Sequence, residues 1–259
     1  MRPVCLAIVT FCLLLSGCGG GSSSTPPPPP PPLSLQSGNW DFSAVSSSGP
    51  SFLIGGNVVQ TGTSITGGLH VVNSACITPS TPVPITGSIS GQTATVTSAA
   101  VASQTITATL SGSATSLTGT YNVTGTGCAG GDRGNIAGVL VPSVSGTWKG
   151  AFVSSVVANP TVITTAVITE GAADANGLFS ISGTATYSGS PCFASGTTAT
   201  GSAISGRTND VILKNNDGST VEFVGFLTNP ATPTQMTGTY TVTGGLCGGD
   251  SGSGTLTKQ

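Results

Sequence analysis

Two stretches of nearly the same sequence decide the fold: Leu117-Thr-Gly-Thr-Tyr-Asn-Val-Thr-Gly-Thr-Gly-Cys128 and Met236-Thr-Gly-Thr-Tyr-Thr-Val-Thr-Gly-Gly-Leu-Cys247. Each is followed by a Gly-Gly-Asp sequence, which ends at Asp132 in one copy and at Asp250 in the other. Within each copy, larger apolar residues and a glycine alternate with threonine or asparagine. A period of two with one apolar face predicts a half-buried antiparallel strand. Two copies predict two modules.

Other landmarks recur in the same order in both halves: a Trp, a Cys, a Ser-Gly turn sequence, the repeated strand and a second Cys. They begin at Trp40 and at Trp148. This order predicts an internal duplication, with module 1 at residues 37–142, module 2 at residues 143–259 and the joint at residues 141–143. Each module has just over 100 residues in this division, which is enough to bury a core of its own.

The fold class predicted from these patterns is all-β, with about eight short strands per module and no convincing amphipathic helix. Turn sequences are found at short intervals, at Gly67-Gly68, Asn176-Gly177 and Asn216-Asp217-Gly218. Sequential strands with tight turns favour two up-and-down barrels, and two-sheet β-sandwiches are the alternative. The Gly-x-Trp opening and the Thr-Gly-Thr-Tyr strand resemble small barrels of the lipocalin and avidin type. This is a fold-level resemblance that brings no ligand-site motif with it.

The composition excludes some partner classes. The chain has 259 residues, a net charge of -2 and only 5 % charged residues, so it has no basic field that would hold nucleic acid. Gly, Ser, Thr, Ala and Val dominate, which disfavours helix and favours strand. Regular alternation after about residue 36 argues against disorder there.

The N-terminus is predicted to be a lipoprotein signal. A short positive start is followed by an apolar run at residues 4–15, which has the length of a signal peptide core and is short for a membrane span. The next residues, Leu15-Ser16-Gly17-Cys18, resemble the lipobox of bacterial lipoproteins. The resemblance implies a signal peptide at residues 1–17, cleavage before Cys18, and lipid on the Cys18 sulfur and on the new amino terminus. Gly19, and not Asp, follows the Cys, and in this the sequence resembles lipoproteins that are sorted to the outer membrane of Gram-negative cells.

Residues 18–36 are predicted to be a lipid-anchored linker. A Gly/Ser segment precedes seven consecutive prolines at residues 26–32. As polyproline II, this run would form a stiff spacer of roughly 22 Å. The expected location is therefore the cell envelope, on a membrane through Cys18, facing the periplasm or the cell surface.

The seven cysteines divide into three groups. Cys5 and Cys12 leave with the signal peptide, and Cys18 is the lipid acceptor. The remaining four are two per module, and an even number in an exported protein predicts disulfides. Of three possible connectivities, the duplication favours one bond within each module, Cys76–Cys128 and Cys192–Cys247. Closing loops of some 50 residues would stabilise each module by about 4 kcal/mol in the chain-entropy model.

The search for catalytic and metal-binding groups leads to the prediction of no enzyme activity, no cofactor and no metal. His70 is the only histidine, which excludes a site with two His ligands or a duplicated triad with His, and we expect it to be a packing or surface residue. Residues 125–130 match the dinucleotide fingerprint formally, but they open no helix and the second module breaks the pattern. Asp132 and Asp250 could offer oxygens to calcium, although a turn role is the simpler interpretation.

The remaining acids are expected mostly at turns, and none stands out as one of a glycosidase pair. Trp40 and Trp148 could form a sugar-stacking platform, but the preferred interpretation is that each plugs the floor of its own module. The predicted function is a membrane-anchored, non-enzymatic envelope lipoprotein with a structural or binding role. The alternatives are a lipocalin-like carrier of a small apolar ligand and, third, an envelope hydrolase.

Overall fold

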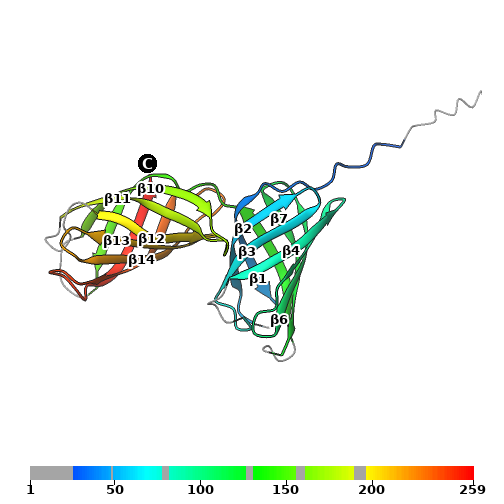
Figure 1. Cartoon of the computed structure of the whole chain (residues 1–259), viewed down its shortest axis with the longest axis horizontal. Helices are drawn as coiled ribbons and strands as arrows, with labels where there is room; N and C mark the ends of the chain where they lie inside the picture. The colour runs from blue at the N-terminus through cyan, green and yellow to red at the C-terminus, as the bar shows by residue number, and fades with distance from the viewer. Residues whose placement is uncertain (1–25, 48, 78–81, 127–130, 156–160, 190–196) are drawn as a thin grey trace, which may run out of the picture. The chain divides into compact units, whose positions relative to one another are not determined.

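Alternating apolar and small polar residues form strands along most of the described chain from Gly38 onward (Figure 1). The computed structural model describes residues 26–47, 49–77, 82–126, 131–155, 161–189 and 197–259. The chain divides into two compact units, residues 1–30 and 31–259, and the second unit contains all sixteen strands. Among the described residues, no helix has the length and apolar character needed to cross a membrane.

The first eight strands form one closed antiparallel barrel, in which each strand pairs with the next and β8 pairs with β1. The strands of this barrel 1 are β1 (Gly38–Ser46), β2 (Phe52–Thr61), β3 (Ser64–Val72), β4 (Val83–Ser90), β5 (Thr93–Ser98), β6 (Gln104–Gly112), β7 (Ser116–Gly125) and β8 (Asp132–Leu140). Closure leaves no edge strand unpaired in the sheet.

The last eight strands form a second closed barrel of the same order, in which β16 pairs with β9. The strands of this barrel 2 are β9 (Gly146–Ser154), β10 (Val162–Ala173), β11 (Phe179–Ser188), β12 (Thr197–Ser205), β13 (Thr208–Asn215), β14 (Thr220–Leu227), β15 (Gln235–Thr243) and β16 (Ser251–Lys258). Two tandem eight-stranded barrels confirm the predicted fold class and exclude the sandwich alternative.

The repeated stretch is the seventh strand of each barrel, β7 and β15. In β7, Leu117, Tyr121 and Val123 are buried, and the threonines between them are exposed. In β15, the residues at the same places are buried as well. The period-two prediction is therefore confirmed in both copies.

A tryptophan closes one end of each barrel. Trp40 and Trp148 have no exposed surface, and each indole Nε1–H donates to the carbonyl oxygen of the residue four positions earlier, at 3.0 Å to Gln36 and 2.8 Å to Val144. The predicted floor role is confirmed, and a sugar platform is excluded because neither ring can be reached. Truncating such a ring to alanine typically costs about 3–5 kcal/mol.

The segment before each Trp adds to this floor. Leu33 and Leu35 belong to the core of barrel 1, and Val141 and Val144 belong to the core of barrel 2. The last residues of the predicted linker therefore pack as part of barrel 1, since the backbone N–H of Leu33 also donates to the carbonyl of Gly91 at 2.8 Å.

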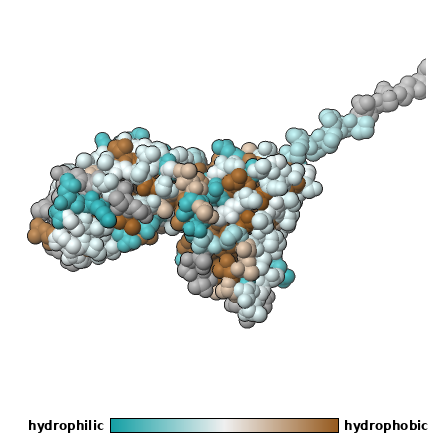
Figure 2. Space-filling model, viewed as in Figure 1, coloured by the Kyte–Doolittle hydropathy of each residue, from teal (hydrophilic) through white to brown (hydrophobic). Residues whose placement is uncertain are grey.

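The outer face of both barrels is built mainly from small polar residues. Figure 2 shows a largely pale surface, as expected for Ser, Thr and Gly, with scattered apolar patches. Two of the predicted turns are confirmed, because residues 176–177 join β10 to β11 and residues 216–218 join β13 to β14. The third is wrong: Gly67 and Gly68 lie inside β3.

Candidate functional site

Residues that are identical in the two copies of the repeat form one hydrogen-bonded cluster in each barrel. In barrel 1, Asp132 accepts a hydrogen bond from Ser46 Oγ at 2.6 Å and from Tyr121 Oη at 2.9 Å, one on each carboxylate oxygen. The strands β1, β7 and β8 supply one residue each, so the cluster ties the closing strands of the barrel together. Burial, and then the hydrogen bond and the charge of Asp132, raise the pKa of Tyr121 to about 12.

Barrel 2 repeats this cluster with the equivalent residues. Asp250 accepts from Ser154 Oγ at 2.5 Å and from Tyr240 Oη at 3.1 Å. Burial, followed by the same two effects of Asp250, raises the pKa of Tyr240 to about 12. A phenol with so high a pKa is neutral near pH 7 and is a weak nucleophile there.

The carboxylates of Asp132 and Asp250, to which the calcium hypothesis refers, lie in hydrogen-bonded clusters. Both carboxylates already accept two side-chain hydrogen bonds. Within the described part of the chain, no group of three or more His, Cys, Asp or Glu residues could hold a metal ion.

The barrel interiors are filled by side chains. Barrel 1 contains an apolar cavity of about 50 Å³ lined by residues such as Phe42, Val71 and Ile106. Barrel 2 contains one of about 20 Å³, lined in part by Phe152 and Phe223. Because one water molecule occupies about 30 Å³ in the liquid, neither cavity has room for a lipid-sized molecule.

The predicted lipidation and disulfide residues are only partly described. Cys18, with the rest of the lipobox, lies outside the described residues, and so do Cys128 and Cys192. Cys76 and Cys247 are described, and neither is a free thiol. The pairing Cys76–Cys128 and Cys192–Cys247 therefore stays a prediction.

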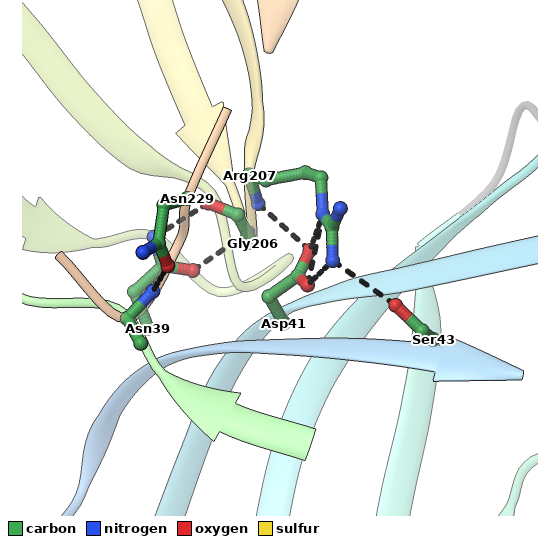
Figure 3. A network of polar contacts seen from close by, with 7 residues as sticks. Asn39, Asp41, Ser43, Gly206, Arg207 and Asn229 are labelled. Carbon is green, nitrogen blue, oxygen red and sulfur yellow. Dashed lines mark hydrogen bonds and ion pairs between the residues drawn. The ribbon is translucent and has the colours of Figure 1, made fainter. Parts of the chain in front are cut away.

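The most extensive set of polar contacts lies between the two barrels, at Asp41 and Arg207 (Figure 3). Asp41 lies on the outer face of β1 and is only 2 % exposed, because the β12–β13 turn of barrel 2 covers it. Its carboxylate accepts hydrogen bonds from Arg207 Nη2 at 2.7 Å, from Nε at 3.0 and 3.1 Å, and from the backbone N–H at 3.0 Å. Arg207 Nη2 also donates to Ser43 Oγ at 3.0 Å.

Side chains on both sides extend this contact to the backbone. The Asn39 amide donates to the Gly206 carbonyl at 3.1 Å and accepts from the Gly206 N–H at 2.7 Å. Ser205 Oγ donates to the Gly55 carbonyl at 2.7 Å. His70 Nε2 lies 3.1 Å from the Asn176 carbonyl, so the single histidine is an inter-barrel contact.

Glycines allow the two barrels to approach this closely. A Cβ atom on Gly55 would lie 2.6 Å from the Cα of Gly206, and a Cβ atom on Gly68 would lie 2.5 Å from the carbonyl oxygen of Asn176. Real Cβ atoms do not approach backbone so closely. Gly68, in the Gly-Gly sequence that suggests a turn, thus marks instead the place where barrel 2 meets β3.

A groove of about 330 Å³ lies beside this contact. Its lining includes His70 and Val72 from barrel 1 and Leu178, Ala203, Asp210 and Val224 from barrel 2. A larger and more open hollow of about 530 Å³ lies over β9, β15 and β16, but its described lining residues are Ser, Thr, Gly, Tyr and Val, and none of these is charged. The first groove is therefore the candidate binding site.

Asp210 gives this groove its charge. Its Oδ1 atom is buried and has no hydrogen-bond partner. Burial, and to a lesser extent the negative charge of Glu222, raises the pKa of the Asp210 carboxyl above its ordinary value. A desolvated carboxylate without a partner is stabilised by any cation that reaches it.

The expectation that the remaining acids lie mostly at turns is wrong for most of them. Asp41, Glu170, Asp210 and Glu222 all lie within strands. Burial raises the pKa of Glu170, whose Oε2 accepts a hydrogen bond of 2.7 Å from a backbone N–H in the floor of barrel 2. Glu170 thus fixes the floor.

Comparison of the chain with models of known protein families, with curated proteins and with solved structures found no match.

Proposed function

We propose that this chain is a lipid-anchored, non-enzymatic protein of the cell envelope whose two barrels form a structural or binding module that acts through its outer surface. The proposal that the barrels act through their outer surface rests on the small size of the interior cavities, about 50 and 20 Å³. Barrels filled with side chains leave the exterior and the inter-barrel groove as the surfaces where a partner can bind.

The saturated polar groups of the repeat support a non-enzymatic role. In both Ser–Asp–Tyr clusters the carboxylate oxygens accept hydrogen bonds, and the phenol keeps its proton up to about pH 12. Catalysis needs a group that can exchange a proton or attack a substrate near the working pH. The most regular feature of the sequence therefore contributes to stability and favours no hydrolase.

The lipid anchor rests on the lipobox that ends at Cys18. Two or more acyl chains, at about 0.8 kcal/mol per buried methylene, would hold the protein stably in a membrane. The Gly/Ser and proline segment that follows would separate the barrels from the lipid surface. The outer membrane of a Gram-negative cell is the proposed location, with the barrels facing the periplasm or the exterior.

Fractionation of cells that express the full chain tests the anchor. The Cys18→Ala variant should accumulate as an uncleaved precursor or be released from the membrane, while the wild type should be extracted from membranes only by detergent. Cys12→Ala is the matched control, because it removes a signal-peptide cysteine and leaves the lipobox intact. Unchanged processing and retention of Cys18→Ala would refute the anchor.

The disulfide pairing is part of this proposal and is supported by the barrel topology. Cys76 lies in the β3–β4 connection, and Cys128 belongs to the sequence between β7 and β8. In an up-and-down barrel these two connections are at the same end, and the same holds for Cys192 and Cys247 in barrel 2. Peptide mapping without reduction should find one bond in each barrel, and a bond between barrels would contradict the pairing.

A carrier role is the second candidate, favoured by the lining of the barrel 1 cavity, which is apolar except for Ser98. A cavity of about 50 Å³ would have to expand several-fold to enclose a drug-sized ligand, since such sites measure about 300 Å³ or more. Native mass spectrometry of protein from its own host distinguishes the two candidates. A retained small molecule that is lost on unfolding would favour the carrier.

A further inference from the structure

The duplication provides an internal comparison for the surface of barrel 2 beside the groove. The β4–β5 turn of barrel 1 and the β12–β13 turn of barrel 2 have matching registers, with Ser90 opposite Thr93 and Ser205 opposite Thr208. Counting from these turns gives pairs of equivalent positions on the outer faces of β5–β6 and β13–β14.

In barrel 1, all of these outward positions hold small hydroxyl residues: Thr93, Thr95, Thr97, Thr107, Thr109 and Ser111. In barrel 2, five of the six have changed character, and the residues are Thr208, Asp210, Ile212, Glu222, Val224 and Phe226. The change introduces two acids and three large apolar residues at one place on a chain that is only 5 % charged.

The barrel itself does not need these residues. Barrel 1 closes with hydroxyl residues at the same positions, so the acids and apolar side chains are not required by strand pairing or by the core. Val224 is 45 % exposed and Phe226 is 49 % exposed, which are high values for such residues in a well-packed protein. Exposed apolar groups next to a carboxylate without a partner are typical of a binding surface.

The groove brings this surface into a concave site. Val72 of barrel 1 and Leu178 of the β10–β11 connection line it together with Val224, and Asp210 contributes the only carboxylate among its described lining residues. Glu222 lies two residue pairs away along the β13–β14 ladder and adds negative charge without lining the groove. Two described basic residues are near in sequence: Lys214 of β13 is exposed and four positions from Asp210, and Arg207 of the β12–β13 turn is paired with Asp41.

We propose that the groove binds a small organic cation, with its ammonium group beside Asp210 and its hydrocarbon part against Leu178 and Val224. Charge determines the class, because Asp210 supplies the only carboxylate among the described lining residues, its Oδ1 atom has no partner in the protein, and an ammonium supplies the opposite charge. Volume determines the size, because 330 Å³ equals about eleven water molecules at about 30 Å³ each. The groove thus has room for a small molecule.

Titration of the full chain with cyclohexylammonium tests the site. The probe is fully charged at neutral pH, as a lysine amine is, and is small enough to enter the groove. Chemical shifts of the ¹⁵N-labelled protein in non-ionic detergent should change saturably for residues of β12, β13 and β14. Cyclohexanecarboxylate, which has the same ring and the opposite charge, should cause no saturable change.

Two variants separate charge from shape. Asp210→Asn keeps the side-chain shape and removes the charge, and it should weaken binding at least tenfold. Ala203→Leu fills the groove from the neighbouring strand β12 and should abolish binding. Asp217→Asn is the matched control, because this exposed acid lies in the β13–β14 turn outside the groove, and its affinity should equal that of the wild type.

Each contrary result overturns the proposal: no saturable change in the wild type, equal affinity in Asp210→Asn or in Ala203→Leu, or equal binding of the carboxylate. The inference rests on the proposed binding role, but its failure is distinguishable from failure of the anchor. Binding depends on Asp210 and membrane retention on Cys18, so protein that stays in the membrane and binds no probe refutes the groove alone.

Discussion

Removing the Arg207 side chain should uncouple the two barrels without unfolding either one. In Arg207→Met, the carboxylate of Asp41 stays 2 % exposed and keeps at most the backbone N–H of residue 207 as a donor, out of four hydrogen bonds from Arg207 in the wild type. Stranding a buried charge in this way costs about 3–5 kcal/mol. The lower end, about 3 kcal/mol, applies here because Arg207 is 24 % exposed and the broken contact can admit water.

The opposite substitution should cost less. Asp41→Asn keeps the shape of the acceptor and leaves a guanidinium that is already partly hydrated, so the loss is that of charge-assisted hydrogen bonds, about 1–2 kcal/mol. The double variant has no stranded charge. It should therefore be more stable than Arg207→Met alone, which is the characteristic sign of a buried ion pair.

Each barrel contains one tryptophan, Trp40 or Trp148, which permits a direct assay. Full chain labelled with 5-fluorotryptophan should give two ¹⁹F resonances, one for each barrel, and both can be followed through urea unfolding. With m of about 1–3 kcal/mol/M for domains of this size, a loss of 3 kcal/mol moves a midpoint by about 1–3 M. In Arg207→Met the less stable barrel should unfold at lower urea, while the transition of the other changes less.

Lys214→Met is the matched control, because it removes an exposed cation from the same barrel. It should leave both midpoints unchanged within about 0.5 kcal/mol. The reasoning is refuted if Arg207→Met behaves like this control, or if the double variant is less stable than Arg207→Met.

Three further predictions concern the pH dependence, the barrel contact and the core. The pKa of Tyr121 is raised to about 12 in the folded state, so the stabilisation from its protonated phenol is complete below about pH 10, and the free energy of unfolding should fall as pH rises toward 12. Absorbance titration should show this late ionisation. Asp132→Asn should lower the pKa of Tyr121 without restoring it to 10, because burial remains. Gly55→Ala places a Cβ 2.6 Å from backbone atoms of the β12–β13 turn, so the ¹⁹F assay should show the same uncoupling as in Arg207→Met, and two unchanged transitions would contradict the contact. Ala108→Val enters the 50 Å³ cavity and should be tolerated, whereas Ala185→Val, at a buried position that lines no such cavity, should cost about 1–3 kcal/mol in urea unfolding; equal costs would argue against the difference between the two interiors.

The barrels were predictable because the relevant signals are local and duplicated. Alternation in the Tyr121 strand sets which residues enter the core, and the second copy at Tyr240 shows that the pattern is no accident. The same logic identifies Trp40 and Trp148 as floors. A closed barrel then follows from eight sequential strands whose edges must pair.

The contact between the barrels was not predictable from periodicity, because it depends on residues that break the repeat. Asp41 has Lys149 as its counterpart after the Trp, and Arg207 has Gln92 as its counterpart in the Ser-Gly-x-Thr turn. In a chain with so few charges, these exchanges between copies are the signal that could have identified the contact. The glycines of β3 led to a wrong turn prediction. A Gly-Gly pair is typical of a turn, and the sequence does not show that Gly68 lies against Asn176 of barrel 2, which is far away along the chain.

The groove was also not predictable from periodicity, because its residues break the repeat as well. Asp210, Glu222 and Val224 occupy positions where the other copy has threonine, and only the register of the barrel shows that these positions are adjacent on one surface. Residues that depart from the repeat carry the specific properties of this protein, while the repeated residues carry its stability.

Mass analysis of the mature N-terminal peptide, purified from membranes of the native host, tests the central proposal most directly. We predict that the peptide begins at Cys18 and carries the added mass of a lipid on its sulfur, with a further acyl chain on its amino group. A mature chain that begins at another residue, or one that begins at Cys18 with no added lipid mass, would contradict it.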